Sequence, residues 1–379
     1  MLALSEDTLM LAESAFNLFR TQDYPAVNRG QREWGRAATG FHPEHWRAAV
    51  DLGWTGVLVP DQLGGLGFPV QGIYGLFEAA GRSLAGLPLL TQLVLAPTLL
   101  CSAREEWTVR AQVIEELLSG DAYYGIAIDE GARHDPKQCQ TLATPDGPGW
   151  RLSGVKRYAL DVVHADWILV SARKPGDSCP SLFRVSKAQA GLAIEPCALL
   201  DLRSRGHVAL NEVSVGEESL VLSGEDFSAC MARALNLGRA ALSAELVGLS
   251  QTVFDTTLEY LQQREQFDRK LGSFQALQHR MARLHAEIQL ARAGVLGALE
   301  GIEASSPLQA GRAVAMAKFK AGEVADLATN EATQLHGGMG VTDELNIGLF
   351  LKRARVAENC LGDQTFQIAQ LSETWEGRT

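Results

Sequence analysis

The sequence predicts an α+β fold that is mostly helical and built in three consecutive parts. Residues 1–125 repeat apolar side chains at intervals of three and four, which is typical of amphipathic helices. Residues 126–222 contain short β-rich runs separated by Gly, Pro, Asp and Ser, and the helical spacing returns over residues 223–379. We therefore expect an N-terminal helical domain, a middle antiparallel, barrel-like β domain and a C-terminal four-helix bundle. No flexible linker separates the parts, so we expect them to pack as one unit.

The composition argues against several classes of protein. The chain of 379 residues is 46% hydrophobic and 21% charged, which is ordinary for a globular protein. Its formal net charge of −11 argues against a nucleic-acid binder, because the phosphate backbone would repel it. The six cysteines are far apart and form no C-x-x-C pair. This spacing predicts neither a zinc site nor a disulfide framework, and it favours a reducing cytoplasm.

The N-terminal part contains no predicted membrane span. The first twenty residues predict an amphipathic helix rather than a secretory signal, because acidic residues interrupt the apolar pattern and no basic segment precedes it. The longest apolar stretch, Leu84–Leu100, is broken by Pro88 and Pro97. A membrane-spanning helix needs about 20 uninterrupted apolar residues. We expect a buried helix with flanking turns at this place.

Short β-rich runs and a turn define the middle part, and longer apolar repeats define the C-terminal part. Pro145–Gly149 predicts a tight turn between two strands. Strands are predicted to include Trp150–Leu152, Trp167–Val170 and His207–Leu210. Helices are predicted near 228–264, 274–303, 307–336 and 343–372.

Two motifs of the C-terminal part contain residues suited to an anionic cofactor. An arginine offers a rigid cationic fork to a pyrophosphate, and adjacent glycines let backbone N–H groups approach a ligand. Taken singly, the arginine could cap a helix, the glycines could only turn the chain, and a lone histidine is more often structural. The candidate cofactor-binding residues are Arg264, Phe267, Phe274, Gln275, Gln334, Leu335, His336, Gly337 and Gly338.

Together these motifs resemble the R-x-x-F…F-Q and Q-x-x-G-G-x-G elements of the acyl-CoA dehydrogenases. The runs Leu52–Gly67 and Glu78–Arg82 are similar to the N-terminal part of that family, so the resemblance covers nearly the whole chain. It implies the family's fold, an FAD cofactor and α,β-dehydrogenation of an acyl-CoA thioester, with electrons passing to an electron-transfer flavoprotein. In the family, the candidate residues reach across a dimer interface to the FAD of the neighbouring subunit.

The catalytic base of that family is missing from both of its known positions. The run Arg353–Gly362 resembles the motif in which a glutamate before the glycine removes the α-proton. Here that residue is Leu361, which cannot hold a proton, and the second position is Gly238. Asp363 and Glu245 remain as possible displaced bases. On a regular helix Asp363 would point away from the direction of Leu361, and Glu245 would lie about 10 Å along the axis from position 238.

The middle part departs from the family where the family holds its flavin. The family's T-E-P-G-x-G-S-D loop corresponds to Ile126–Asp135, which is one residue short, lacks the G-S pair and has Asp129 at the threonine position. The family's K-x-W-I-T/S strand corresponds to a run with Tyr158 at the tryptophan and Leu160 at the hydroxyl position. An anion at Asp129 would oppose the negative charge of a reduced flavin.

The candidate cofactor-binding residues of the C-terminal part therefore match the family's active site. The residues at the positions of the flavin-binding loop and of the base do not. In a symmetric homo-oligomer no site would be complete. The combination resembles the non-catalytic subunit of the α2β2 acyl-CoA dehydrogenases of bacterial sterol side-chain breakdown. It implies a paralogous catalytic partner, an FAD shared with that partner and bulky, steroid-type substrates. The alternatives are an autonomous dehydrogenase that uses Asp363, a flavin monooxygenase of the same fold, and a homomeric pseudoenzyme without catalytic activity.

Overall fold

The chain folds into two compact units that interleave along the sequence. A computed structural model describes residues 6–33, 43–201 and 203–376. What we call the helical unit comprises residues 1–29, 70–85 and 239–379, and the sheet unit comprises residues 30–69 and 86–238. The predicted domain boundaries after residues 125 and 222 stay predictions, because these units join segments that are distant in sequence.

Helices precede the sheet, as the apolar spacing predicts. They are α1 (Glu6–Arg20), α2 (Tyr24–Glu33), α3 (Pro43–Asp51), α4 (Gly72–Ser83), α5 (Ala96–Cys101) and α6 (Arg110–Ser119), with 3₁₀ turns η1 (Trp54–Gly56) and η2 (Asp61–Leu63). The predicted amphipathic helix is confirmed by α1, whose buried Leu11, Ala15 and Phe19 recur every four residues. The stretch Leu84–Leu100 is mostly buried, as predicted, and a π-helical turn, η3 (Leu90–Leu95), leads into α5.

The sheet unit is built on one mixed β-sheet. Its strands are β1 (Tyr124–Ala127), β2 (Leu142–Asp146), β3 (Gly149–Leu160), β4 (Trp167–Ala172), β5 (Ser181–Ser186), β6 (Leu192–Pro196), β7 (Arg205–Val215) and, after the 3₁₀ turn η4 (Glu217–Ser219), β8 (Leu220–Leu222). The order is β6-β7-β3-β1-β4-β5-β8, and β2 pairs with β3. The predicted strand runs lie in β3, β4 and β7, and the predicted turn closes the β2–β3 hairpin.

One pairing of this sheet departs from the antiparallel prediction. Strands β1 and β4 run parallel, whereas the other pairs are antiparallel. Parallel neighbours need a long connection, and the β2–β3 hairpin lies in the chain between β1 and β4. The core of this unit is formed by buried side chains of the strands themselves, such as Phe183, Val185, Val208 and Leu210.

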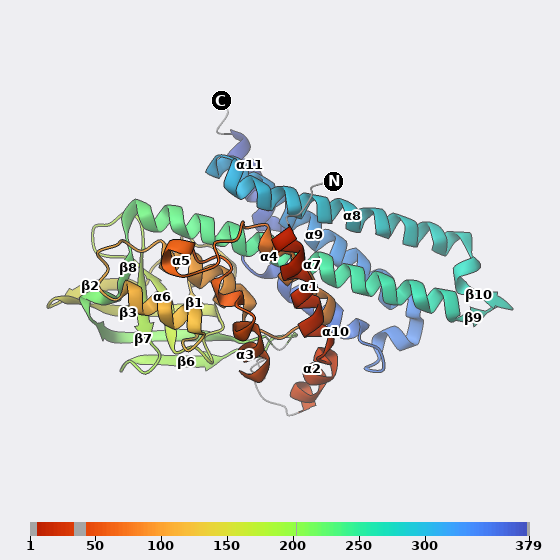
Figure 1. Cartoon of the computed structure of the whole chain (residues 1–379), viewed down its shortest axis with the longest axis horizontal. Coiled ribbons are helices and arrows are strands. Elements are labelled where there is room, and N and C mark those ends of the chain that lie inside the picture. The colour runs from red at the N-terminus through yellow and green to blue at the C-terminus, as the bar shows by residue number, and fades with distance from the viewer. Residues whose placement is uncertain (1–5, 34–42, 202, 377–379) are drawn as a thin grey trace. The chain divides into compact units, whose positions relative to one another are not determined.

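The C-terminal part is helical and contains a small hairpin. Its elements are α7 (Gly224–Gln263), β9 (Glu265–Gln266), β10 (Arg269–Lys270), η5 (Leu271–Ser273), α8 (Gln275–Ala304), α9 (Pro307–His336), η6 (Gly337–Val341), α10 (Ile347–Asn359) and α11 (Gln364–Glu376). Helices α8 and α9 pack side by side (Figure 1). The first three predicted helices of this part are confirmed by α7, α8 and α9.

The predicted fourth helix, 343–372, is wrong, because two helices take its place. Helix α10 ends at Asn359, and α11 begins at Gln364. Between them Leu361 has φ 58° and Gly362 has φ 108°. These left-handed values cannot continue a right-handed helix. The apolar period runs through the break, so periodicity alone does not reveal it.

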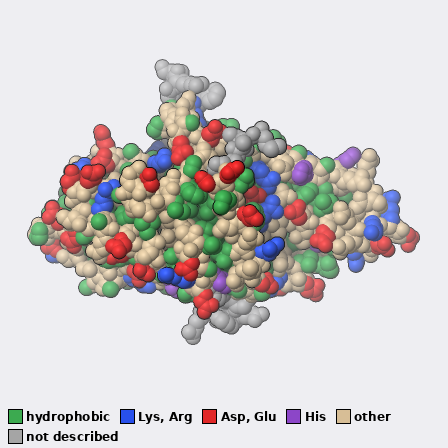
Figure 2. Space-filling model, viewed as in Figure 1, with side chains coloured by type: hydrophobic (Ala, Val, Ile, Leu, Met, Phe, Trp, Pro, Cys, Tyr) green, Lys and Arg blue, Asp and Glu red, His purple; other side chains and the backbone are tan. Residues whose placement is uncertain are grey.

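The surface is of mixed charge. Acidic and basic side chains are interspersed over the face shown in Figure 2. Within the described ranges, no helix combines the length and the apolar character needed to cross a membrane.

Two glycines let α4 and the part of α7 after residue 238 approach each other closely. A Cβ added at Gly248 would lie 2.1 Å from the carbonyl oxygen of Glu78, and one added at Gly81 would lie 2.0 Å from that of Glu245. Such distances leave no room for a methyl group against a rigid backbone. The packing of these helices in the helical unit therefore depends on both glycines.

We predict that Gly248→Ala lowers the free energy of unfolding by about 1–3 kcal/mol, because the new methyl group overpacks the contact with Glu78. Gly294→Ala is the matched control, since a Cβ on this exposed glycine of α8 would meet nothing within 4 Å. The control should raise the stability by up to about 1 kcal/mol. Urea denaturation measures both changes, and a Gly248→Ala variant as stable as the unsubstituted protein would contradict the prediction.

Candidate functional site

The turn between α10 and α11 contains Leu361, which the family resemblance predicts to stand at the position of the base. Leu361 is buried, with 6% of its surface exposed. The Nε of Arg239 donates a hydrogen bond of 2.8 Å to its carbonyl oxygen, and the guanidinium of Arg239 lies 4.9 Å from the ring centre of Phe366. A left-handed backbone costs a non-glycine residue about 1–2 kcal/mol. The contacts of Arg239 stabilise this turn, while the side chain at its centre stays apolar.

Asp363, the first possible displaced base, caps a helix. Its Oδ1 accepts a 2.8 Å hydrogen bond from the backbone N–H of Phe366, which is the geometry of an N-terminal cap on α11. The expectation that Asp363 points away assumed a regular helix, and the irregular turn removes that assumption. The carboxylate is instead engaged in holding the first turn of α11.

Glu245, the second possible displaced base, is held in a buried ion pair. Arg353 donates from Nε to Oε1 of Glu245 at 2.7 Å and from Nη2 to Oε2 at 2.6 Å. Both residues are buried, with 4% and 8% of their surfaces exposed. Bidentate arginine–carboxylate ion pairs are strong, and removing one partner would leave the other as an uncompensated buried charge. Gly238, the alternative base position, is a buried glycine within α7.

A buried lysine that the sequence analysis missed supports the same turn. Lys318 donates hydrogen bonds to the carbonyl oxygens of Ala357 at 3.0 Å and Glu358 at 2.6 Å, near the end of α10. Burial lowers the pKa of Lys318 to about 8. A cation at the C-terminal end of a helix is favourable. No spacing rule identifies Lys318, because its partners lie on another helix.

The first cofactor motif forms an exposed hairpin. Phe267 and Asp268 form the two-residue loop between β9 and β10, with φ 57° and 59°. Phe267 exposes 82% of its surface, and its ring meets that of Phe274 edge-on at 6.2 Å. The guanidinium of Arg269 lies 3.7 Å from the ring centre of Phe274. The hairpin thus exposes the ring of Phe267, and the contact of this ring with a cofactor stays a prediction.

Tyr260 joins the two cofactor motifs at one end of the helical unit. Its carbonyl oxygen accepts a 2.8 Å hydrogen bond from the N–H of Arg264, and its ring stacks on His336 at 4.3 Å. His336 is buried, its Nδ1 donates to the carbonyl oxygen of Ala332 at 2.9 Å, and burial lowers its pKa. His336 thus supports the loop from within. Its predicted contact with a cofactor stays a prediction.

The glycine loop of the second motif is open to solvent. Gly337 has φ 61° and ψ −134°, a conformation that essentially only glycine adopts. A Cβ at Gly337 or Gly338 would meet nothing within 4 Å. Gln334 is exposed and Leu335 is half-buried. The loop therefore leaves space next to its backbone for a ligand.

The exposed residues of the helical unit fit part of an FAD site. Arg264 and Gln275 are exposed, and within the described part of the chain the guanidinium of Arg264 has no hydrogen-bond or ion-pair partner. An unpaired guanidinium suits a pyrophosphate, and an exposed ring such as Phe267 suits a flat ring system. The roles of the individual residues stay predictions.

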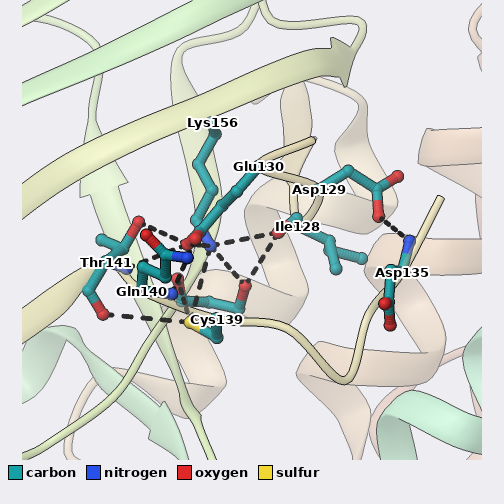
Figure 3. Close-up of polar contacts among 9 residues, drawn as sticks. Ile128, Asp129, Glu130, Asp135, Cys139, Gln140, Thr141 and Lys156 are labelled. Atoms are coloured by element: carbon teal, nitrogen blue, oxygen red, sulfur yellow. Dashed lines mark hydrogen bonds and ion pairs between the residues drawn. The ribbon is translucent and has the colours of Figure 1, made fainter. Parts of the chain in front are cut away.

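In the sheet unit, the loop at the flavin position is bonded to itself. Oδ2 of Asp129 accepts a 2.9 Å hydrogen bond from Nδ1 of His134, and Oδ1 accepts one of 3.1 Å from the N–H of Asp135. Figure 3 shows the side chain of Asp129 turned toward Asp135. The carbonyl oxygen of Asp129 accepts from the N–H of Arg157. The loop thus presents a carboxylate where the family has a hydroxyl.

A buried lysine anchors the same loop to β3. Lys156 is fully buried, and its Nζ lies 2.7 Å from Oε1 of Glu130 (Figure 3). The same nitrogen lies 2.9 Å from Oγ of Ser171. Thr141 donates to Glu130 from both its backbone N–H and its hydroxyl. Burial alone would raise the pKa of Glu130, but the contacts with Lys156 and Thr141 outweigh it and lower the pKa to about 2.

The strand that would face a flavin is also altered. Tyr158 is exposed at a bulge of β3 with φ 50°, and its ring packs edge-on against His207 at 5.0 Å. Leu160 is buried and pairs with Ile126. Neither side chain offers an aliphatic hydroxyl at this place. The sheet unit therefore does not fit a flavin in the manner of the family.

The remaining surface of the described chain shows no cluster of three or more His, Cys, Asp or Glu able to hold a metal ion. A shallow cavity of about 790 Å³ in the sheet unit is lined mainly by α6 and includes Trp107, Arg110 and Glu115. None of the candidate cofactor-binding residues lines it.

Two family models match the chain. The acyl-CoA dehydrogenase N-terminal domain matches residues 5–121, and the acyl-CoA dehydrogenase C-terminal domain matches residues 227–375. The chain belongs to the acyl-CoA dehydrogenase family. The acyl-CoA dehydrogenases are flavoprotein oxidoreductases, and the predicted family and fold are thereby confirmed.

Individual acyl-CoA dehydrogenases are similar over almost the whole length. FadE27 of Mycobacterium tuberculosis is 30% identical over 352 residues, which cover 90% of each chain. The ChsE4–ChsE5 complex from Mycobacterium tuberculosis contains a chain that is 27% identical, with a TM-score of 0.87 over 99% of this chain and 98% of that one. A variant of the Tcur3481–Tcur3483 steroid ACAD gives 26% identity and a TM-score of 0.85, over 98% of each chain.

We predict that Glu130 stabilises the fold in a pH-dependent way. The pKa of Glu130 is lowered on folding from 4.5 to about 2, so its contribution is complete above about pH 4.5 and is lost as the pH falls toward 2. Glu130→Gln should remove a contribution on the order of 2 kcal/mol at neutral pH and flatten the pH profile of unfolding in this window. The exposed Glu105→Gln variant should keep the original profile. Parallel profiles for Glu130→Gln and the unsubstituted protein would count against the prediction.

Proposed function

We propose that this chain is the non-catalytic subunit of an FAD-dependent acyl-CoA dehydrogenase complex. A paralogous catalytic chain pairs with it in an α2β2 assembly, and this chain completes the partner's FAD site. The partner supplies the base that removes the α-proton. FAD, when bound there, accepts the hydride, and its electrons pass on to an electron-transfer flavoprotein.

The observation that carries the proposal is that neither carboxylate that the sequence offers as a displaced base is free to act as one. The side chain at that position is apolar and buried, and position 238 is glycine. The carboxylate of Asp363 caps α11, and that of Glu245 is paired with Arg353. A general base needs a carboxylate free to accept the substrate's proton. Both alternatives from the sequence are therefore engaged in structural contacts.

The contrast between the two units supports a role toward a partner. In the helical unit, Arg264, Phe267 and the glycine loop are exposed. In the sheet unit, Asp129 and Glu130 bond within their own loop. Homomeric assembly would combine one usable face with one unusable face at every site. A partner with an intact flavin loop would give one complete site for each pair of chains.

The steroid-type substrate class rests on the relatives. Two solved structures that resemble this chain, at 26% and 27% identity, are the Tcur3481–Tcur3483 steroid ACAD and the ChsE4–ChsE5 complex. Both names join two different proteins. We therefore propose bulky, steroid-type acyl-CoA thioesters as substrates of the complex.

In the complex, the residues of this chain bind and orient the cofactor. Arg264 would hold the pyrophosphate, Phe267 would pack on the cofactor, and the N–H groups of Gly337 and Gly338 would donate to its polar atoms. Leu361 and its turn keep the local fold of the family without contributing a proton acceptor.

We predict that Arg264→Ala, tested in the co-expressed complex, weakens FAD retention roughly tenfold or more, because a charge-assisted hydrogen bond is lost. Assembly with the partner should persist, as judged by co-purification. Arg264→Lys should be intermediate, since it keeps the charge but loses the fork. Arg233→Ala, which removes an exposed arginine of α7, is the control. Full flavin content in purified Arg264→Ala complex would refute this assignment.

We predict that Asp363→Ala leaves the turnover of the complex unchanged and lowers the stability of this chain by about 1 kcal/mol, because α11 loses its cap. Steady-state rates and urea denaturation separate the two effects. Asp363→Asn is the matched variant, because an amide also caps a helix but cannot act as a base. Loss of turnover in both variants would favour the autonomous enzyme with a displaced base.

A further inference from the structure

A buried cysteine and a buried lysine face each other in the sheet unit. The Sγ of Cys139 lies 3.7 Å from the Nζ of Lys156 (Figure 3). Lys156 is fully buried, and Cys139 retains 8% of its surface exposed. The pair lies away from the cofactor motifs in the sequence, and the proposed function gives it no role.

Hydrogen-bond acceptors surround the side-chain nitrogen of Lys156. Its Nζ has four acceptors within reach, namely the carbonyl oxygen of Ile128, Oε1 of Glu130, Oγ of Ser171 and Sγ of Cys139. An ammonium group has only three N–H donors, so the four contacts cannot all be made at once. The carboxylate of Glu130, at 2.7 Å, is the nearest acceptor for a proton leaving the nitrogen.

We propose that Cys139 and Lys156 form a covalent sulfur–nitrogen cross-link when the protein meets a peroxide. In the first step Sγ attacks the peroxide, the O–O bond breaks, and the thiol becomes a sulfenic acid with release of water. The sulfur loses two electrons, which the peroxide gains.

In the second step one proton leaves Nζ of Lys156 for solvent by way of Glu130, which is partly exposed, and the nitrogen attacks the sulfur. The S–N bond forms, the S–O bond breaks, and the leaving hydroxide takes a second proton from the nitrogen to become water. One peroxide is consumed for each cross-link. The product is a sulfenamide beside the Glu130 carboxylate, and one proton has passed to solvent.

Burial controls both the rate and the outcome of this reaction. It raises the pKa of Cys139, while the charge of Lys156 opposes that rise, so the thiol is not highly reactive and excess peroxide is needed. The oxidant has to be as small as hydrogen peroxide, because Cys139 exposes only 8% of its surface. Once a sulfenic acid has formed, the amine at 3.7 Å is in place to trap it before further oxidation.

The cross-link would alter the loop that stands at the flavin position. It would tie Cys139 to β3 and remove the charge of Lys156. Glu130 would then lose the cation that lowers its pKa. The reaction needs only this chain, so it can be tested apart from the proposed function.

The test is to treat the folded full-length chain with excess hydrogen peroxide, digest it without reductant and analyse the peptides by mass spectrometry. We expect the Cys139 and Lys156 peptides to appear joined, with two hydrogens lost, and to separate after treatment with dithiothreitol. A joined pair with one further oxygen also supports the proposal, since a second peroxide converts the sulfenamide to a sulfinamide and is reduced to water.

Variants identify the groups involved. Cys139→Ser and Lys156→Arg should abolish the joined pair, Glu130→Gln should reduce its yield severalfold, and Cys101→Ser should leave the yield unchanged. The unsubstituted protein decides the question even if a variant does not fold. Recovery of Cys139 as a free thiol, or only as sulfinic or sulfonic acid with Lys156 unlinked, overturns the proposal.

Discussion

Arg239 holds the turn on which the functional interpretation depends. Its Nε bonds to the carbonyl oxygen of Leu361, and its guanidinium packs on Phe366 of α11. These contacts stabilise a left-handed residue that separates α10 from α11. Gly362 is required next to it, because a Cβ there would lie 2.4 Å from the ring of Phe366. The backbone of this turn is thus held by the chain's own interactions, and the side chain at its centre is a leucine, which cannot accept a proton.

The two units differ in whether their candidate site residues are available to a cofactor. The helical unit keeps an unpaired Arg264, an exposed Phe267 and an open glycine loop, all suited to a cofactor. In the sheet unit, the contacts among Asp129, His134, Glu130 and Lys156 satisfy the loop internally. Retention of one face and closure of the other are what a subunit that serves a partner's site requires.

The sequence predicts the regular parts of this structure well, because they follow from local patterns. Apolar periodicity locates α7, α8 and α9, whereas the cofactor roles that the family motifs give to Arg264, Phe267 and the glycine loop stay predictions. The break at Leu361 could not be predicted, since it depends on Arg239, which is 122 residues away. The pairing of Glu245 with Arg353 spans 108 residues and follows from no spacing rule. The parallel β1–β4 pair likewise depends on tertiary arrangement rather than on local preference.

The most direct test is the flavin content of this chain expressed alone and together with its paralogous partner. Absorbance at the flavin band, divided by protein concentration, gives the ratio for each preparation. We predict that the chain alone is colourless and that the co-purified complex carries one FAD for each pair of chains, with dehydrogenase activity. A homomeric preparation with one FAD for each chain and acyl-CoA dehydrogenase turnover would contradict the central claim.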